Sequence, residues 1–563
     1  MLEGGRIDFP RQEGGTYSEA LVVADAGTKP AIFEIYDGAV VTGKIEVALA
    51  ENTKGAVYQY GGDVFQTTRN GNDGTLGRFG QAYWWVGGGK LSANSPDLFY
   101  ALATRKDAEA QLEIQSGKLE FTGANSLLLG RHSSRAEMYM GGGEASLSYI
   151  HVGGDLNWSA DKGATAGGMG VLTLSGTNNP SLTVGTTLNL CVRTNEYTGV
   201  VNLNAGVLAV NAIRSTSQDA TSRGCKSYLN FNGGALKYQN TKNPFSASLL
   251  PTRITVYGGG ATIEFTQNSS LSSLGSVRLL RPTGRGIKSI TVPASADVTG
   301  YAMPPVVKIS GGGGEDATAY VRFDPRTGTI GRDIEVTSPG INFETAPMVT
   351  ITAPDMKTPV VCDVELTGSE QEDGGIMLKG TSESIVNASD FAFMTNLTGA
   401  IVIGPGITLY PRITGVPNPF SANKELRMAG GAYSAWNSNP SWRRVGGYGK
   451  TRAWDPNWFS VTEALFFRAE DLEQGLCLTH DCGYITLGDG VVVEIDDFSK
   501  LTQRKYTLLK FEYNGTQSGD ENYLHGSAPR LADGAPAGWR LRLSANKKKL
   551  TLVHDEGTTL LLR

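Results

Sequence analysis

The sequence predicts an all-β chain folded as a β-solenoid, with a small inserted Gly/Pro-rich β-module and β caps. The first observation is a strand–turn unit that recurs roughly every 25–30 residues, which is typical of stacked architectures. The second is the glycine content, 73 of 563 residues, which is about twice the usual share. The third is that only 19% of the residues are charged, with no extended apolar stripe of helical period.

Each copy of the unit is an alternating apolar run, a Gly-rich break and a second alternating run. In the copy at 201–210, alternation directs Val201 and Leu203 inward and Asn202 and Asn204 outward. Hairpins in a sandwich would also fit such breaks, but a row of units buries the inner faces that one unit leaves open. The copies lie at 57–66, 83–93, 112–121, 138–147, 201–210, 229–238 and 254–265.

Changes in regularity divide the chain into five parts. The module shows two copies of a P-x-V-x-I pattern, Pro305–Ile309 and Pro347–Ile351, around a glycine run that lacks the Lys-Ser/Thr of a phosphate loop. The segment 461–476 is the one plausible helix, and it also fits strand and loop. The expected parts are an N-terminal cap (1–56), regular solenoid repeats (57–284), the inserted Gly/Pro-rich module (285–360), an irregular solenoid with a Trp-rich loop at 431–460 (361–483) and a C-terminal β cap (484–563).

Charge and hydropathy exclude several classes of protein. The net charge of −5 comes from well-mixed signs, so the basic stripe of a nucleic-acid-binding protein is missing. No apolar run is long enough to cross a membrane. The N-terminus has no apolar signal-peptide core, which leaves a mature secreted form or a cytosolic chain, and the Gly-rich β-repeats favour the secreted form.

The five cysteines form no C-x-x-C pair, so we expect no zinc site. Cys477 and Cys482 are close enough in sequence to bridge a loop. Cys191 and Cys225 fit neighbouring coils of a solenoid, and Cys362 is then left over. Unbridged thiols remain an equally open interpretation.

Acidic residues give no clear catalytic site. In 491–498, Glu494 and Asp496 share a strand face, and Asp497, Asp481 and Asp489 are near in sequence. Paired carboxylates serve general acid–base chemistry on polysaccharides, but a solvated outer face explains them equally simply, and we favour that reading. We therefore predict no catalytic residue, no metal ligand and no cofactor.

Aromatic residues give the stronger local signal. Four of the eight tryptophans fall between residues 436 and 458, interleaved with arginine and tyrosine. Exposed Trp and Tyr beside Arg anchor protein interfaces or stack on sugar rings, whereas packing of a long loop is the alternative. In the Trp84–Trp85 pair, alternation exposes one ring. The candidate interface or glycan contacts are Trp436, Trp442, Arg443, Arg444, Tyr448, Trp454, Trp458 and Trp85.

The segment 171–213 resembles the autotransporter-associated β-strand repeat of bacterial surface proteins. The resemblance rests on the G-x-L-T-L-S-G-x-N-like opening at Gly170–Asn178 and the V-N-x-G-x-L-like ending at Val201–Leu208. It implies a right-handed parallel β-helix of the passenger type, on or released from a bacterial cell. The chain after the last clear repeat is too short and irregular for the C-terminal membrane barrel of that family.

These observations predict a non-catalytic extracellular or cell-surface structural protein that builds a fibre, layer or filament through contacts between its own copies. Its partners would be copies of itself, head-to-tail or lateral, and host or matrix glycans. The alternatives are a glycan-binding adhesin and a polysaccharide lyase or hydrolase on the same fold.

Overall fold

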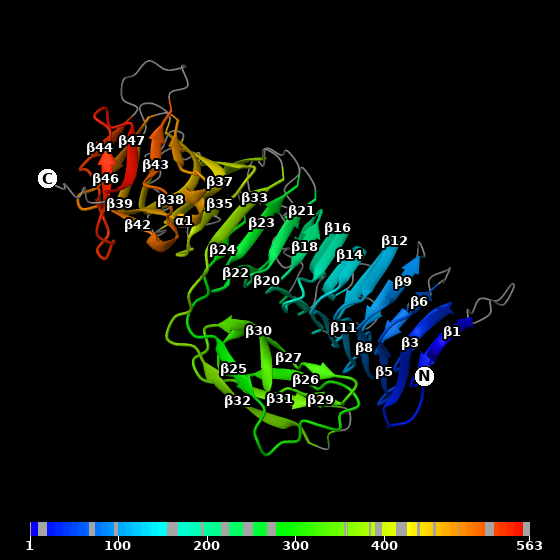
Figure 1. Cartoon of the computed structure of the whole chain (residues 1–563). Coiled ribbons are helices and arrows are strands. Elements are labelled where there is room, and N and C mark those ends of the chain that lie inside the picture. The colour runs from blue at the N-terminus through cyan, green and yellow to red at the C-terminus, as the bar shows by residue number, and fades with distance from the viewer. Residues whose placement is uncertain are drawn as a thin grey trace, which may run out of the picture. The chain divides into compact units, whose positions relative to one another are not determined.

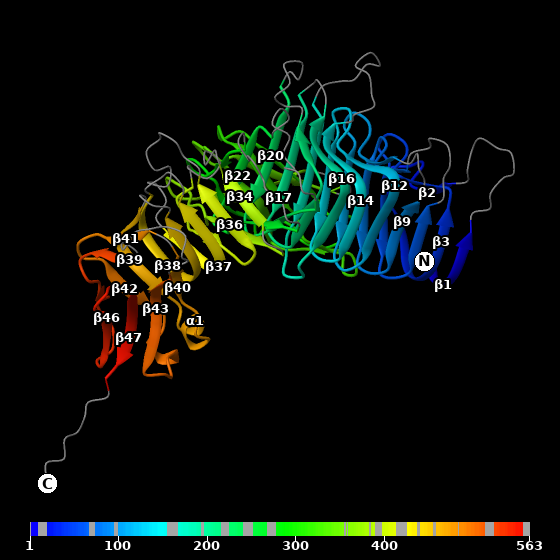
Figure 2. The ribbon, with the colours of Figure 1, turned by 90° about the horizontal axis from the view of Figure 1, so that it is seen from above.

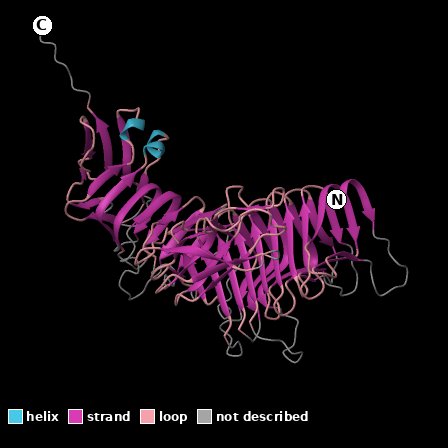
Figure 3. Ribbon diagram, turned by 90° about the horizontal axis from the view of Figure 1, so that it is seen from below, coloured by secondary structure: helices cyan, strands magenta, loops and turns pink. Residues whose placement is uncertain are grey.

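The computed structural model confirms an all-β solenoid of stacked parallel coils, about 14 turns in all, with 58% strand and 2% helix among its residues. Figure 3 shows strands almost throughout and only short helical pieces. The chain forms two compact units, residues 1–238, 244–261 and 280–372 in unit 1 and residues 239–243, 262–279 and 373–563 in unit 2. The structure describes residues 2–8, 20–66, 74–94, 99–154, 167–192, 196–215, 224–239, 251–266, 277–353, 356, 358–381, 384–388, 397–411, 425–435, 440–453, 458–481, 483–512 and 523–555.

In unit 1, the strand pairings form three parallel ladders, which we call sheets A, B and C. Figure 2 shows the strands stacked along the solenoid. The first, sheet A, contains β1 (Leu2–Asp8), the first half of β3 (Ala31–Thr42), β5 (Lys54–Gln59), β8 (Gln81–Val86), β11 (Glu109–Ile114), β13 (Arg135–Met140), β15 (Met169–Leu174), β17 (Thr198–Leu203), β20 (Lys226–Phe231) and β22 (Arg253–Val256).

The other two sheets of unit 1 share several long strands that bend from one sheet into the next. Sheet B contains the second half of β3, β6 (Asp63–Gln66), β9 (Lys90–Asn94), the first halves of β12 (Lys118–Leu129), β14 (Glu144–Gly154) and β16 (Ser181–Val192), β18 (Val207–Val210) and β21 (Ala235–Tyr238). Sheet C contains β2 (Ala20–Val23), β4 (Lys44–Val47), β7 (Gly74–Leu76), β10 (Phe99–Leu102), the second halves of β12, β14 and β16, and β19 (Ile213–Ser215).

Parallel register stacks equivalent side chains of successive coils on one another. Gln81 pairs with Glu109, and Glu109 with Arg135, so the coils advance by 28 and 26 residues, as the repeat period predicts. The side chains of sheet A that point into the solenoid stack into one column, which we call the inward column. All of its members are apolar, and each is 3% exposed or less. Its members are Val57, Trp84, Leu112, Met138, Leu172, Val201, Leu229 and Ile254.

One corner of unit 1, between sheets C and A, repeats a left-handed backbone conformation from coil to coil. Glycine occupies this corner at Gly77, Gly130 and Gly153, where a Cβ atom would approach a backbone carbonyl of a neighbouring coil within 2.9, 2.2 and 2.5 Å. Other coils place alanine there, and one places cysteine. The positive φ values are 64° for Ala24, 55° for Ala48, 68° for Gly77, 54° for Ala103, 73° for Gly130, 75° for Gly153 and 50° for Cys191.

The Gly/Pro-rich region forms an antiparallel module, from Ile287 to Leu366, within unit 1. Its six-stranded sheet has the order β26-β31-β32-β25-β30-β27, and a two-stranded β28–β29 ribbon completes it. The two P-x-V-x-I segments pair with each other, Val307 with Ile351 and Ile309 with Val349. Figure 1 shows the module as a separate sheet beside the solenoid strands. The strands are β25 (Ile287–Thr291), β26 (Val306–Ser310), β27 (Glu315–Tyr320), β28 (Phe323–Asp324), β29 (Thr329–Ile330), β30 (Asp333–Ile341), β31 (Met348–Thr352) and β32 (Val360–Leu366).

Unit 2 is also built mainly from parallel strands, and it ends in antiparallel pairs. Strand β47 pairs antiparallel with β43 and with β46, so β46 and β47 form a terminal hairpin within the expected C-terminal segment. Its strands are β33 (Ile376–Gly380), β34 (Ser384–Ala388), β35 (Ile401–Ile403), β36 (Ile407–Pro411), β37 (Glu425–Ala435), β38 (Ser441–Ala453), β39 (Trp458–Phe467), β40 (Leu478–His480), β41 (Tyr484–Leu487), β42 (Val492–Ile495), β43 (Lys505–Phe511), β44 (Leu524–Gly526), β45 (Arg530–Leu531), β46 (Trp539–Leu543) and β47 (Lys549–His554). The chain passes between the units at β23 (Ala261–Phe265) and β24 (Leu279–Leu280).

In unit 2 the structure corrects one sequence expectation and decides between the alternatives left open for another segment. The described part of 431–460 lies in strands β37, β38 and β39 rather than in a loop. The segment 461–476 contributes the end of β39 and only a five-residue helix, α1 (Ala469–Glu473), followed later by a 3-10 turn at Phe498–Lys500. Leu465 pairs with Val445 and Val493 in parallel ladders, and these inter-strand bonds outweigh the local helical preference of the segment.

The inward column makes unit 1 sensitive to single cavities. We expect Leu172→Ala, in the middle of that column, to lower the free energy of unfolding by about 2–5 kcal/mol, because the removed atoms leave a cavity that the neighbouring coils close only in part. Urea unfolding followed by circular dichroism measures the loss. The control is Glu144→Ala, whose carboxylate is 66% exposed in a surface ion pair with Lys118 and should change stability by about 0.5 kcal/mol or less.

Candidate functional site

The aromatic stretch does not form an exposed contact surface around Trp442. The side chain of Trp442 is fully buried, and the ring of Tyr433 packs edge-on to it with centroids 5.9 Å apart. Trp442 pairs with Val461, which pairs with Leu487, so its indole belongs to an interior apolar column. The expectation that Trp442 contacts a partner or a glycan is therefore wrong, because alternation in β38 directs this ring inward.

The two arginines beside Trp442 are held in ion pairs. The Arg443 Nε atom lies 2.5 Å from Glu463. The Arg444 guanidinium donates two hydrogen bonds to Glu494, of 2.8 and 2.6 Å, and a third to Glu425, and these carboxylates raise the pKa of Arg444. Tyr448 is half-buried in the same strand.

The remaining tryptophans of the stretch give no described side chain. Trp436 and Trp454 lie outside the described residues, and Trp458 begins β39 with only its backbone described. No contact surface can therefore be assembled from these three residues. Among the predicted contacts of this stretch, Arg443 alone is a described and exposed side chain.

Trp85 is half-buried, and its partner Trp84 is fully buried, as alternation predicts. The Trp85 ring lies 5.2 Å from that of Tyr60, which stacks at 4.7 Å on Tyr36 of the preceding coil. Tyr36 is 41% exposed. The stacked contact covers one face of the Tyr36 ring and one face of the Tyr60 ring.

The acidic residues near the C-terminus have local structural partners. Glu494 is the bidentate partner of Arg444, and Asp496 accepts a 2.7 Å hydrogen bond from the backbone of Ala469 at the start of α1. Asp497 caps the following 3-10 turn, Asp481 pairs with Arg452, and Asp489 accepts a hydrogen bond from Ser527. None of these contacts brings two carboxylates together as an acid–base pair.

The largest group of buried polar side chains lies where the module covers the outer face of sheet A. We call this interface the seam. Its centre is Glu113, which is 1% exposed and accepts hydrogen bonds from the hydroxyls of Tyr83 at 2.6 Å and Tyr320 at 2.5 Å. Gln115 donates to the other carboxylate oxygen. Burial raises the pKa of Glu113 in spite of these three donors.

A second group in the seam surrounds Glu335 of the module. The Arg322 Nε atom lies 2.7 Å from its carboxylate, and Ser175 and Tyr139 of the solenoid donate hydrogen bonds of 2.5 and 3.1 Å. The Arg322 guanidinium lies over the Tyr139 ring at 4.5 Å, and Tyr320 stacks on the same ring with centroids 4.2 Å apart. The guanidinium of Arg322 thus lies between the carboxylate of Glu335 and the face of the Tyr139 ring.

Amide side chains join the seam to the later coils. Asn202 donates to Thr318 at 2.9 Å, and Asn230 donates to Asp316 at 3.1 Å and to Asn202 at 3.0 Å. Asn204 donates to the backbone oxygen of Thr337. Asn202 does point away from the solenoid interior, as alternation predicts, but the module buries it completely.

The seam has the buried carboxylates and raised pKa values that mark many active sites, yet these side chains are covered on both sides by protein. Lys308 of the module also pairs with Glu109 of sheet A at 2.7 Å. An apolar cluster that includes Ala56, Tyr83 and Phe323 continues the same interface. The seam is therefore built as a joint between two parts of unit 1.

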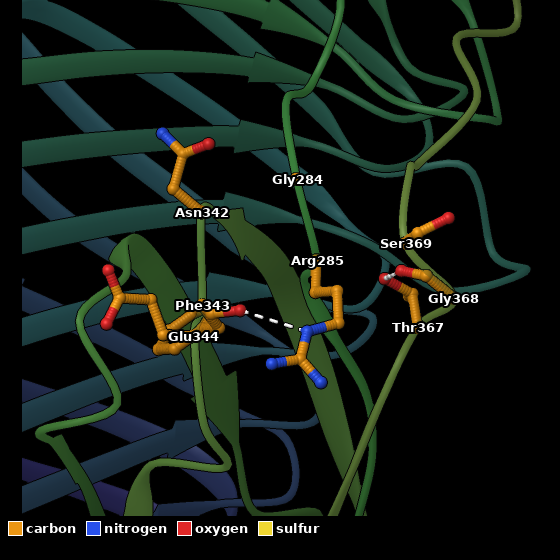
Figure 4. Close-up of a pocket in the computed structure, with 8 residues that line it drawn as sticks. All are labelled: Gly284, Arg285, Asn342, Phe343, Glu344, Thr367, Gly368 and Ser369. Atoms are coloured by element: carbon orange, nitrogen blue, oxygen red, sulfur yellow. Dashed lines mark hydrogen bonds between the residues drawn. The ribbon is translucent and has the colours of Figure 1, made fainter.

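Two surface hollows of unit 1 are open to solvent. The first, about 710 Å³, lies at the base of the module (Figure 4). The Nε atom of Arg285 donates to the Phe343 carbonyl at 3.1 Å, while Asn342, Glu344 and Ser369 point away from the guanidinium. The second, about 620 Å³, is lined by Thr28, Glu51, Asn52, Thr53, Lys54, Phe79, Gly80, Gln81, Lys106 and Asp107.

Comparisons with known proteins assign no family. No family model, curated protein or solved structure matches the chain. Within the described ranges, no three His, Cys, Asp or Glu side chains are grouped to hold a metal ion. No helix in the described part of the chain is long and apolar enough to span a membrane.

Because Trp442 is buried, replacing it should lower the stability of the fold and not only the binding of a partner. We expect Trp442→Ala to destabilise unit 2 by about 3–5 kcal/mol, because it opens a large cavity in an interior column. Arg443→Ala, one residue away on the exposed side of the strand, should cost about 0.5 kcal/mol or less. Denaturant unfolding of both variants measures this difference, and equal stability of the two would contradict the burial of Trp442.

The half-buried carboxylate of Asp316 predicts that the stability of the seam depends on pH. Desolvation raises the pKa of Asp316 well above that of an unfolded aspartate, so at intermediate pH the folded chain retains a proton that the unfolded chain releases. The contribution of Asp316 to stability is therefore fully present below the unfolded pKa, and it is lost as the pH rises from the unfolded pKa through the folded pKa. We expect Asp316→Asn to remove this loss and to stabilise the chain by about 1–2 kcal/mol at pH 8.

Thermal melts of the wild-type chain and of Asp316→Asn at pH 5 and pH 8 measure this dependence. Asp363→Asn, on an exposed position of the same module, is the control for a general charge effect. The same pH slope in all three proteins would contradict a buried proton at Asp316.

Proposed function

We propose that this chain is a non-catalytic structural protein, a β-solenoid scaffold that assembles with copies of itself into a fibre or layer outside the cell. The observation that carries the proposal is the distribution of exposed apolar side chains. Four of the six large ones among the described residues lie on the first coils of unit 1, namely Val22, Ile32, Tyr36 and Phe65.

Ile32 and Tyr36 lie on the outer face of sheet A. The module covers this face from the next coil onward but leaves these two side chains exposed. Ile32 pairs with Ala56 across sheet A, and Ala56 belongs to the apolar cluster under the module. Ile32 is 48% exposed and Tyr36 41% exposed. An apolar patch beside an existing interface is a natural contact for another protein surface, and a second copy of this chain is the occupant that we propose.

The rest of unit 1 supports a mechanical role. Its coils bury continuous apolar columns, and the module is tied to sheet A by charged and amide side chains that have partners within the unit. Such a joint resists displacement because a buried polar group that loses its partner costs free energy. A long surface of fixed geometry suits a spacer or scaffold.

The extracellular location rests on the resemblance of 171–213 to repeats of bacterial surface proteins. The alternative functions receive less support. A glycan-binding site built on Trp442 would need an exposed ring. A lyase or hydrolase built on Glu494 and Asp496 would need carboxylates that are not already engaged by Arg444 and by the start of α1.

Self-assembly is tested by electron microscopy and sedimentation of the purified chain over a range of concentrations. We expect filaments or sheets, and we expect the double variant Ile32→Ser/Tyr36→Ser to raise the concentration for half-assembly at least about tenfold, since it removes two apolar contacts.

The matched control is Met348→Ser/Val361→Ser, which alters the other two exposed apolar side chains, 58% and 57% exposed on the module. It should assemble like the wild-type chain. A wild-type chain that stays monomeric at high concentration would overturn the proposal, and equal loss in both double variants would reject the first coils as the contact.

A further inference from the structure

Two cysteines meet at the repeating corner of unit 1. Cys191 takes the left-handed corner position, with φ of 50°, that Gly153 holds one coil earlier, as the pairing of Gly154 with Val192 shows. A side chain therefore stands where the two preceding coils have Gly130 and Gly153. Cys225 immediately precedes β20, in the next coil, whose Lys226 pairs with Thr198.

The carbonyl oxygen of Tyr197 brings the two coils together at this point. The Cys191 Sγ atom donates to it at 3.1 Å, and the Lys226 backbone N–H donates to it at 2.8 Å. The side chains of Cys191 and Cys225 interact with each other. With Tyr197 they form a separate buried cluster, in which Cys191 is 0% and Cys225 7% exposed.

The two thiols differ in reactivity. The contact with Cys191 lowers the pKa of Cys225, and the same contact together with burial raises the pKa of Cys191. A thiolate is the nucleophile in disulfide exchange. Cys225, which is also the more accessible of the two, is thus the first to react.

We propose that Cys191 and Cys225 are a cross-linking site, at which a low-molecular-weight disulfide converts the two thiols into one disulfide that joins adjacent coils. The Cys225 thiolate attacks one sulfur of the reagent, and the other sulfur leaves as a thiolate. Cys191 then loses its proton and attacks the Cys225 sulfur, releasing the second reagent thiol. Two protein thiols are oxidised while one disulfide is reduced to two thiols.

The cross-link would restrict the unfolded chain and leave the folded corner in place, because both sulfur atoms already lie in one cluster. A covalent loop of this kind stabilises mainly by reducing the freedom of the unfolded chain. The inference does not depend on self-assembly or on the location of the protein.

The test exposes the folded full-length chain to oxidised glutathione, blocks the remaining thiols and maps peptides by mass spectrometry without reduction. We expect a peptide pair joined through Cys191 and Cys225, lighter by two hydrogen atoms than the sum of its parts. The melting temperature should rise by about 5 °C and return on reduction.

Variants separate this site from other thiol chemistry. Cys225→Ser should abolish both the cross-linked pair and the shift in melting temperature, whereas Cys477→Ser, at a thiol of unit 2, should retain both. Folding of each variant is checked by circular dichroism. Recovery of Cys191 and Cys225 only as thiols or as separate glutathione adducts in the wild-type chain would overturn the proposal, and this readout needs no variant.

Discussion

The parallel in-register pairing of successive coils is the constraint on which the rest of this structure depends. It places each side chain directly beside its equivalents in the coils before and after, so a position is chosen for a whole column rather than for one residue. The column from Val57 through Trp84 to Leu229 can be buried because every member is apolar. The same rule repeats a left-handed backbone at one corner, where Gly130 and Gly153 avoid a collision with the next coil.

The outer columns of sheet A pose the opposite problem, since stacked Tyr, Glu and Asn side chains are costly to bury unless each finds a partner. The module supplies a hydrogen-bond partner to each of several of these side chains. Tyr320 reaches Glu113, Thr318 reaches Asn202 and Asp316 reaches Asn230, so alternate residues of β27 bind side chains of three different coils, on β11, β17 and β20. Module and solenoid therefore depend on each other, and a scaffold of fixed geometry follows from that dependence. The exposed continuation of this surface at Ile32 and Tyr36 is where we place the contact with another copy.

Much of the fold follows from local pattern, and most of the functional surface does not. Alternation correctly assigns Leu203 to the interior and separates buried Trp84 from half-buried Trp85, because period-two alternation is a property of the strand alone. The P-x-V-x-I segments mark two strands that pair. The burial of Asn202 cannot be predicted from the sequence, because alternation shows only that the side chain points outward. It does not show that a segment more than a hundred residues later covers that side chain. The pattern of tryptophans and arginines around Trp442 predicts a contact loop, which is wrong. In strand β38 the Trp442 ring points inward, and Arg443 and Arg444 point outward into ion pairs.

The most direct test of this account is hydrogen exchange of the full chain in increasing urea, followed at β27 of the module and at β17 and β20 of the solenoid. If the buried polar seam couples the two parts, amides in all three strands become exchangeable together, with the same dependence on urea. Exchange of β27 at urea concentrations where β17 and β20 remain fully protected would show that the module detaches by itself, and would contradict the central claim.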